Sequence, residues 1–221
     1  MKVPFAVLMV AATLVLAPVA RAADHHNITL TFIRHAESTA NAAHIIDTSV
    51  PGPDLTPLGA SQAVAVAINP APYDGIWAST MVRTQETAAP LSAVLHEPVD
   101  VLDGLKEIPA GDDEGKPTSA PQSDAPKSWL RGDRTARIPG AIDGDEFEAS
   151  FNSAVQAIYD SGETSPVAFS HGWSIAYWVL MNTRNADPAP AKDLLPNTAR
   201  VVITGNPDDG WTLVSWNGMP V

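Results

Sequence analysis

The sequence predicts an α/β protein, a three-layer α/β/α sandwich with a mostly parallel central sheet and an antiparallel edge. Short apolar runs rich in β-branched residues alternate with longer runs of helical spacing, which favours parallel strands joined by helices. Near the carboxyl end, two strand-like runs flank the turn-rich residues 205–210, a pattern typical of a hairpin. The length of 221 residues fits one domain.

The first strand is expected at residues 28–33, because the run ITLTFI is rich in β-branched and aromatic side chains. The first helix is expected at residues 57–68, where Thr56 is a suitable N-cap and Pro57 suits the first helical position. By the same criteria the later strands are expected at residues 73–79, 99–102, 166–169, 200–204 and 211–216, and the later helices at residues 84–95, 145–160 and 173–181.

Residues 104–144 interrupt this alternation of strands and helices. They are rich in Gly, Pro, Asp, Lys and Arg and contain few apolar residues, and the segment is too long for an ordinary connection. We expect a lid or substrate loop here, inserted into a single domain that spans residues 23–221.

Residues 1–22 have the pattern of a secretory signal peptide. Lys2 precedes an apolar run at residues 3–20, and the small residues Ala20 and Ala22 fit a cleavage site. An uncleaved amino-terminal anchor is the alternative. The expected location is therefore outside the cell or in the periplasm or cell envelope, with no membrane contact after cleavage.

Cleavage after Ala22 would place Ala23, Asp24 and His25 at the new terminus. A free amine, two amide nitrogens and an imidazole at the third position can bind Cu(II) or Ni(II) in a square plane. A loose polar tail is the simpler interpretation, since chain termini are usually poorly ordered.

Charge and cysteine content exclude several classes of partner and chemistry. Without residues 1–22 the chain holds 11 basic and 25 acidic residues, a formal net charge of −14. Such a surface repels nucleic acid and anionic membranes. The chain has no cysteine, which excludes disulfide bonds and chemistry on a thiolate. Any anionic substrate must therefore be attracted by a local cluster of cations.

Anion-binding side chains follow three of the expected strands. Arg34 and His35 follow the first strand. Arg83 follows the second after a short loop, and His171 follows the fourth. Loops that leave the carboxyl ends of parallel strands meet in one crevice. Guanidinium groups match the oxygens of a phosphoryl group, and an imidazole can be nucleophile, proton carrier or donor. The sequence therefore predicts phosphate chemistry on histidine.

The stretch RHAESTAN at residues 34–41 resembles the signature of the histidine phosphatase superfamily, whose fold is that of phosphoglycerate mutase. Ala36 stands where the family usually has glycine. Four further stretches match the family in the expected order, namely residues 54–59 with Gln62, residues 79–83 with Glu86 and Thr87, residues 105–108 with Gly111, Glu114 and Gly115, and residues 170–172 with Ile175.

The resemblance implies that His35 attacks phosphorus and carries the phosphoryl group as a covalent phosphohistidine. Nearby cations disfavour a protonated His35, and a hydrogen bond from its other nitrogen to a backbone carbonyl would fix its tautomer. No metal or other cofactor is implied. The side chains that the resemblance assigns to the phosphoryl oxygens are Arg34, Arg83, His171 and, more weakly, Asn41.

The resemblance places the proton donor for the leaving alcohol at Glu107, which would then accept a proton from the attacking water. Beside a bound phosphate dianion a carboxylic acid holds its proton more firmly, so we expect an acidic pH optimum, as in an acid phosphatase. The alternative is that Glu107 is one more solvated charge beside Asp112, Asp113 and Glu114.

Two other site assignments also have simpler alternatives. Arg83 has Glu86 three residues further along a helix and can form a surface ion pair with it. Glu37 and Ser38 are expected to cap and polarise the start of a helix rather than to touch the substrate.

The function predicted from these residues is hydrolysis of a phosphomonoester, either a phosphorylated small molecule or a phosphoprotein. Export would separate the protein from glycolytic intermediates, which favours this over a mutase of the phosphoglycerate type. A non-catalytic phosphate-binding module is the other alternative. Arg131, Arg134 and Arg137 are candidates for further substrate contacts or for a solvated loop. Oligomeric state does not follow from the sequence.

Overall fold

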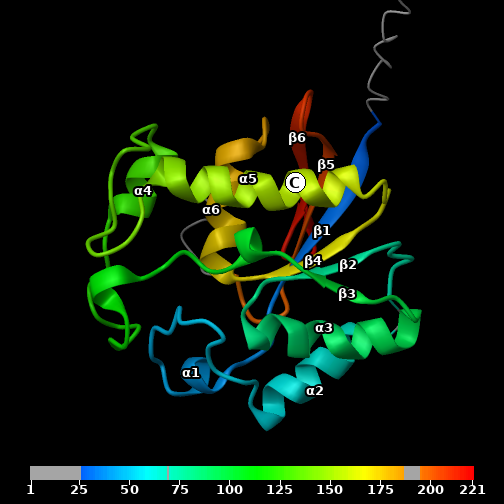
Figure 1. Cartoon of the computed structure of the whole chain (residues 1–221), viewed down its shortest axis with the longest axis horizontal. Helices are drawn as coiled ribbons and strands as arrows, with labels where there is room; N and C mark the ends of the chain where they lie inside the picture. Colours follow the sequence, from blue (N-terminus) through cyan, green and yellow to red (C-terminus); the bar gives the residue numbers. More distant parts are fainter. Residues whose placement is uncertain (1–25, 69, 187–194) are drawn as a thin grey trace, which may run out of the picture.

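The computed structural model describes residues 26–68, 70–186 and 195–221, so the expected signal peptide and the possible metal site at residues 23–25 lie outside the described residues. The described strands form one mixed sheet in the order β3-β2-β4-β1-β5-β6-β7 (Figure 1). They are β1 (Ile28–Arg34), β2 (Ile76–Ala78), β3 (Val99–Val101), β4 (Val167–Ser170), β5 (Arg200–Asn206), β6 (Gly210–Trp216) and β7 (Met219–Pro220).

Strands β1 to β4 are mutually parallel where they pair, and β5 to β7 add an antiparallel edge. This confirms the expected fold class. The helices are α1 (Thr39–Ala42), α2 (Pro57–Val66), α3 (Val82–Leu95), α4 (Ala125–Leu130), α5 (Gly144–Asp160) and α6 (Gly172–Asn182), with short 3-10 turns η1 (Asp103–Leu105) and η2 (Gly111–Asp113). Figure 1 shows α2 and α3 on one side of the sheet and α5 and α6 on the other.

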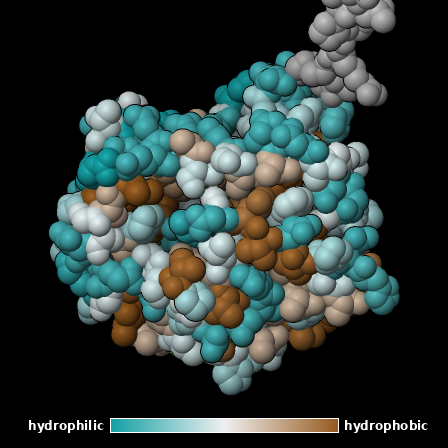
Figure 2. All heavy atoms as spheres, in the orientation of Figure 1, coloured by the Kyte–Doolittle hydropathy of each residue, from teal (hydrophilic) through white to brown (hydrophobic). Residues whose placement is uncertain are grey.

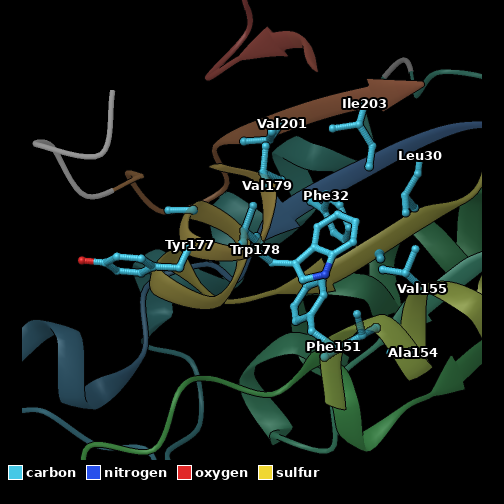
Figure 3. Packing of buried hydrophobic residues seen from close by; sticks show 14 of the residues in the cluster. Leu30, Phe32, Phe151, Ala154, Val155, Tyr177, Trp178, Val179, Val201 and Ile203 are labelled. Atoms are coloured by element: carbon cyan, nitrogen blue, oxygen red, sulfur yellow. The ribbon is translucent and has the colours of Figure 1, made fainter. Parts of the chain in front are cut away.

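Strand β1 is buried on both faces, and its alternating side chains supply two separate cores. Phe32 belongs to the larger cluster, which includes Phe151 from α5 and Trp178 from α6. Ile33 belongs to the smaller cluster, which packs under α3. The Trp178 ring lies 5.7 Å from that of Phe32 and 5.2 Å from that of Phe151, measured between centroids (Figure 3). Both helical layers are therefore held to the sheet by apolar side chains.

The helix starts follow the expected capping chemistry. The Thr56 hydroxyl accepts a hydrogen bond from the Gly59 amide at 2.9 Å, and Pro57 begins α2. At α5, Asp143 forms a capping box with Glu146. These local interactions fix the ends of the two helices.

Most observed boundaries lie within two residues of the expected ones, and two differences bear on the site. The strand expected at residues 73–79 is reduced to Ile76–Ala78, because the Asp74 carboxylate accepts hydrogen bonds from the amides of Thr164 and Ser165 and ties the chain into a turn. The helix expected at residues 84–95 begins at Val82. Arg83 therefore lies in the first turn of α3 rather than in the preceding loop.

The segment at residues 104–144 contains more structure than a loop. It includes η2 and α4, and Trp129 and Ile138 are buried in the larger core. The Trp129 ring stacks on Phe147 of α5 at 5.6 Å, and its indole nitrogen donates to the Ala136 carbonyl at 2.7 Å. These few apolar residues hold part of the segment against the domain.

The outer surface carries both polar and apolar side chains. On the face shown in Figure 2, separate hydrophobic patches lie among hydrophilic residues. Within the described ranges, no helix combines the length and the apolar character needed to cross a bilayer.

Replacing Phe151 by alanine should lower the free energy of unfolding by about 3–5 kcal/mol, because the ring is fully buried between Phe32 and Trp178. Denaturant unfolding measures this change. Val64→Ala, at an exposed position on α2, is the control and should change stability little. A loss below about 1 kcal/mol for Phe151→Ala would contradict the packing described here.

Candidate active site

The carboxyl ends of β1 and β4 bring the two expected histidines together. Arg34, the last residue of β1, is the register partner of Ser170, the last residue of β4. His35 and His171 follow these residues directly, and their ring centroids lie 5.1 Å apart at an interplanar angle of 59°. Parallel pairing of the two strands therefore places both rings at one edge of the sheet.

Two hydrogen bonds define the state of the His35 ring. Its Nδ1 lies 2.7 Å from the carbonyl oxygen of Ala36, so Nδ1 carries the proton and donates it. Its Nε2 lies 3.2 Å from Nε of Arg83, which is always a donor, so Nε2 is unprotonated and its lone pair accepts this hydrogen bond. Burial lowers the pKa of His35 well below its usual value, and the charges of Arg83 and Arg34 lower it further. The ring is therefore neutral, with Nε2 as its unprotonated nitrogen.

His171 is the N-cap residue of α6 and is completely buried. Its Nε2 lies 2.8 Å from the Ser79 hydroxyl, which follows β2. Burial, followed by the charge of Arg83, lowers the pKa of His171 well below the usual range. Its Nδ1 is buried without a hydrogen-bond partner.

In both arginines, some guanidinium nitrogens donate hydrogen bonds within the protein and one buried nitrogen does not. Arg34 donates through one terminal nitrogen to the Leu195 carbonyl. Arg83 donates through Nη2 to the Asp47 carbonyl at 3.4 Å and to the sulfur of Met81 at 3.1 Å. Burial lowers the pKa of both guanidinium groups. Each keeps a buried nitrogen without a partner, Nε of Arg34 and Nη1 of Arg83.

The described buried side-chain nitrogens without hydrogen-bond partners all belong to the candidate site. Across the described residues, the buried side-chain nitrogen and oxygen atoms that lack a hydrogen-bond partner are Arg34 Nε, Arg83 Nη1 and His171 Nδ1. Buried polar groups are normally satisfied, and an exception calls for an explanation such as a ligand. All three belong to side chains that the family resemblance assigned to phosphate binding. The two guanidinium nitrogens are donors, and His171 Nδ1 is a donor when its Nε2 accepts from the Ser79 hydroxyl.

Glu107 is half-buried at the amino-terminal end of α6 and is not a freely solvated charge. Its Oε1 accepts from the amides of Ile108 and Ser174, each at 2.9 Å, and its Oε2 accepts from the amide of Trp173 at 3.2 Å. The positive end of the α6 dipole adds to this attraction. The carboxyl group is held in the same pocket as Arg34, His35 and Arg83.

Asn41 lines the same pocket, with its side-chain oxygen already occupied. That oxygen accepts from the Ser38 amide at 3.3 Å and from the side chain of Asn197 at 3.1 Å. Ser38 caps α1, as expected from the sequence, while Glu37 accepts from the Thr56 hydroxyl at 2.7 Å. Asn41 can therefore offer only its amide nitrogen to an anion.

The alternative for Arg83, a surface ion pair with Glu86, does not fit the structure, because the Glu86 carboxylate accepts from the Leu55 amide at 2.8 Å instead.

The arginines of the 104–144 segment lie outside the pocket. Arg134 pairs with Glu148, Arg137 with Asp143 and Glu146, and none of the three candidates at 131, 134 and 137 lines the pocket.

Three supporting residues were not singled out from the sequence as site residues. Asn197 donates to the His35 carbonyl at 2.9 Å as well as to Asn41. Ser79 holds His171, and the Thr87 hydroxyl accepts from the Ala36 amide at 3.0 Å. Ser79 and Thr87 lie within the family-like stretches, which was their only signal. Asn197 lies in none, and nothing in its local sequence marks it.

The described part of the chain holds no group of three or more His, Cys, Asp or Glu side chains placed to bind a metal ion.

The model of the histidine phosphatase superfamily (branch 1) matches residues 30–218. The chain belongs to this superfamily.

A mycobacterial relative, the PE-PGRS family protein PE_PGRS11 of Mycobacterium tuberculosis (strain ATCC 25618 / H37Rv), is 42% identical over 217 residues. The match covers 88% of the chain but only 37% of that protein, so the chain spans little more than a third of its relative.

Solved structures of similar fold include a mycobacterial glucosyl-3-phosphoglycerate phosphatase, with a TM-score of 0.69 and 23% identity over 86% of the chain and 98% of that structure. A phosphoserine phosphatase from Entamoeba histolytica, in complex with 3-phosphoglyceric acid, has a TM-score of 0.69 and 24% identity over 87% and 98% of the two chains. Both support the assigned fold.

This histidine phosphatase superfamily member accommodates alanine at position 36, where the family usually has glycine. The Ala36 side chain is fully buried, and the residue uses both backbone groups, donating to Thr87 and accepting from His35. The methyl group of Ala36 is therefore accommodated next to His35, and the hydrogen bond from His35 Nδ1 to the Ala36 carbonyl is kept.

Both histidine rings should remain neutral at about pH 6, because their pKa values are lowered from the usual 6.5. Nitrogen-15 NMR of the imidazole groups should show the Nδ1-protonated form for His35. The unfolded chain takes up these protons below about pH 6.5 and the folded chain does not, so the free energy of unfolding falls as the pH drops below that value.

A midpoint near 6.5 for His35 or His171 would contradict the buried, cation-flanked environment of the two rings.

Proposed function

We propose that the chain is a phosphomonoester hydrolase that forms a covalent phosphohistidine on His35. The observation that carries the proposal is the set of buried, unpartnered nitrogens on Arg34, Arg83 and His171 around a neutral imidazole. Guanidinium donors, joined by an imidazole N–H when Ser79 donates to Nε2 of His171, are suited to the equatorial oxygens of a phosphoryl group in transfer. The phosphatase names of the structural neighbours add support.

In the first step, the lone pair on Nε2 of His35 attacks phosphorus and the bond from phosphorus to the alcohol oxygen breaks. Glu107 gives its proton to that oxygen, so the alcohol leaves neutral. The phosphorylated ring gains positive charge, which the hydrogen bond from Nδ1 to the Ala36 carbonyl stabilises. The arginines neutralise the phosphoryl oxygens throughout.

In the second step, water attacks the phosphohistidine and the phosphorus–nitrogen bond breaks. The Glu107 carboxylate accepts the proton of the attacking water, and the electron pair returns to Nε2. Three backbone amides hold the Glu107 carboxyl group in position for both proton transfers. Inorganic phosphate then leaves, and the ring is again neutral. We also propose that the reaction takes place outside the cytoplasm, on the basis of residues 1–22.

A rapid-quench experiment with a radiolabelled aryl phosphate tests the mechanism. Wild type should form acid-labile phosphoprotein, and His35→Ala should form none. Glu107→Gln should still be phosphorylated by an ester with a good leaving group, with turnover reduced by about 10²–10⁴-fold. His96→Asn, at an exposed residue in the left-handed region that asparagine tolerates, is the control and should behave as wild type.

Equal slow release of phosphate by all of these proteins, without labelled intermediate, would refute the phosphohistidine. Binding of phosphate without turnover of any ester would instead favour the non-catalytic module.

A pH profile and a leaving-group comparison test the acid phosphatase part of the proposal and the role of Glu107. Wild type should turn over an ester of a poor leaving group faster at about pH 5.5 than at about pH 8.5, because the leaving alcohol must receive a proton. Glu107→Gln should slow such an ester more than an ester of a good leaving group, which needs no proton to leave. A wild-type maximum at about pH 9 or above would rule out the acidic optimum.

A further inference from the structure

The part of the pocket that would receive the alcohol of the substrate is lined by many apolar side chains from separate parts of the chain. They are Ile46, Ile108, Pro109, Pro126, Ile138 and Trp173. The uncharged polar side chains of Thr48, Thr118, Gln122 and Ser123 line it as well. Ile108 and Ile138 are each 4% exposed, so both are packed into the domain. Trp173 lies against Tyr177, with ring centroids 5.9 Å apart.

The other charged side chains that line this part of the pocket are acidic. Besides Arg34, Arg83 and Glu107, the charged residues among the described lining are Asp47 and Asp113. The Asp47 carboxylate accepts from the amide and hydroxyl of Ser49. The Asp113 carboxylate pairs with the Lys116 ammonium group at 2.9 Å, which offsets its charge and occupies that ammonium group. In the described ranges, no cation lines this part of the pocket beyond the two arginines that the phosphoryl group would occupy.

Binding of a substrate with a second negative charge in this pocket is therefore unfavourable in free energy. That charge would lose water, face the Asp47 carboxylate, and find no guanidinium or ammonium group free to pair with it among the described lining residues. An uncharged apolar group would instead replace water against isoleucine, proline and tryptophan side chains, which is favourable.

We infer that this pocket selects phosphomonoesters of uncharged, largely apolar alcohols, such as aryl or branched alkyl phosphates, and discriminates against esters whose alcohol carries a carboxylate. The inference rests on the proposed function and adds a substrate class to it. It sets the chain apart from the neighbour that binds 3-phosphoglyceric acid, whose ligand carries a carboxylate. It also argues against a mutase of the phosphoglycerate type.

A matched pair of esters tests the inference on the wild-type protein. The esters are 4-ethylphenyl phosphate and 4-(2-carboxyethyl)phenyl phosphate, in which two methylene groups separate the carboxylate from the ring and keep the leaving-group acidities similar. We expect kcat/KM, measured by phosphate release, to be about tenfold or more higher for the ethyl ester. Phosphoprotein trapped from each ester is measured in parallel.

Ile45, which lines the pocket and is 40% exposed, is the position for a matched pair of variants. Ile45→Lys supplies the missing cation and should reduce the preference for the ethyl ester severalfold. Ile45→Gln has similar polarity without the charge and should keep the preference.

The outcomes separate the inference from the function on which it rests. Hydrolysis of both esters through phosphoprotein with equal efficiency, or faster hydrolysis of the carboxylated ester, would overturn the inference and leave the proposed function standing. Failure to release phosphate or to form phosphoprotein from either ester would overturn both. An unchanged preference in Ile45→Lys would also contradict an electrostatic origin for the selectivity.

Discussion

Parallel pairing of β1 with β4 is the constraint on which the rest of the site depends. The pairing aligns Arg34 with Ser170, so the residues that follow each strand leave the sheet at the same level. Pairing of β4 with β2 then brings Ser79 against His171. A one-residue slip in either register would turn these side chains to the opposite face. The apolar packing on both sides of β1 therefore also fixes the positions of the polar groups.

Burying two guanidinium groups and two imidazoles together is costly, and the structure offsets only part of this cost. The histidines avoid it by remaining neutral, and the arginines use backbone carbonyls and a sulfur atom. A bound anion can accept hydrogen bonds from the guanidinium nitrogens left without partners, and these bonds favour its binding. An arrangement that is unfavourable for the empty protein is thus favourable for the complex, as expected of a preorganised site.

Much of the site could be predicted from the sequence, because strand and helix patterns placed Arg34, His35 and His171 at strand ends. Arg34 and His35 line the pocket, and the buried ring of His171 lies beside that of His35. The hydrogen bond of His35 to a backbone carbonyl was also anticipated. Asn197 was not, since it reaches the site from a segment with no local signal. Trp129 was overlooked because a single tryptophan in a polar segment does not reveal its tertiary partner, Phe147.

The Glu107 carboxylate and His171 are both held at the amino-terminal end of α6. His171 is the residue at which α6 begins, and two of the amides that hold Glu107 belong to the first turn of that helix. A displacement of α6 would carry both groups in the same direction, as parts of one rigid body. Thermal motion of the pocket wall can thus alter how fast an alcohol or a phosphate ion escapes, while the spacing between the carboxyl group and this imidazole stays nearly constant.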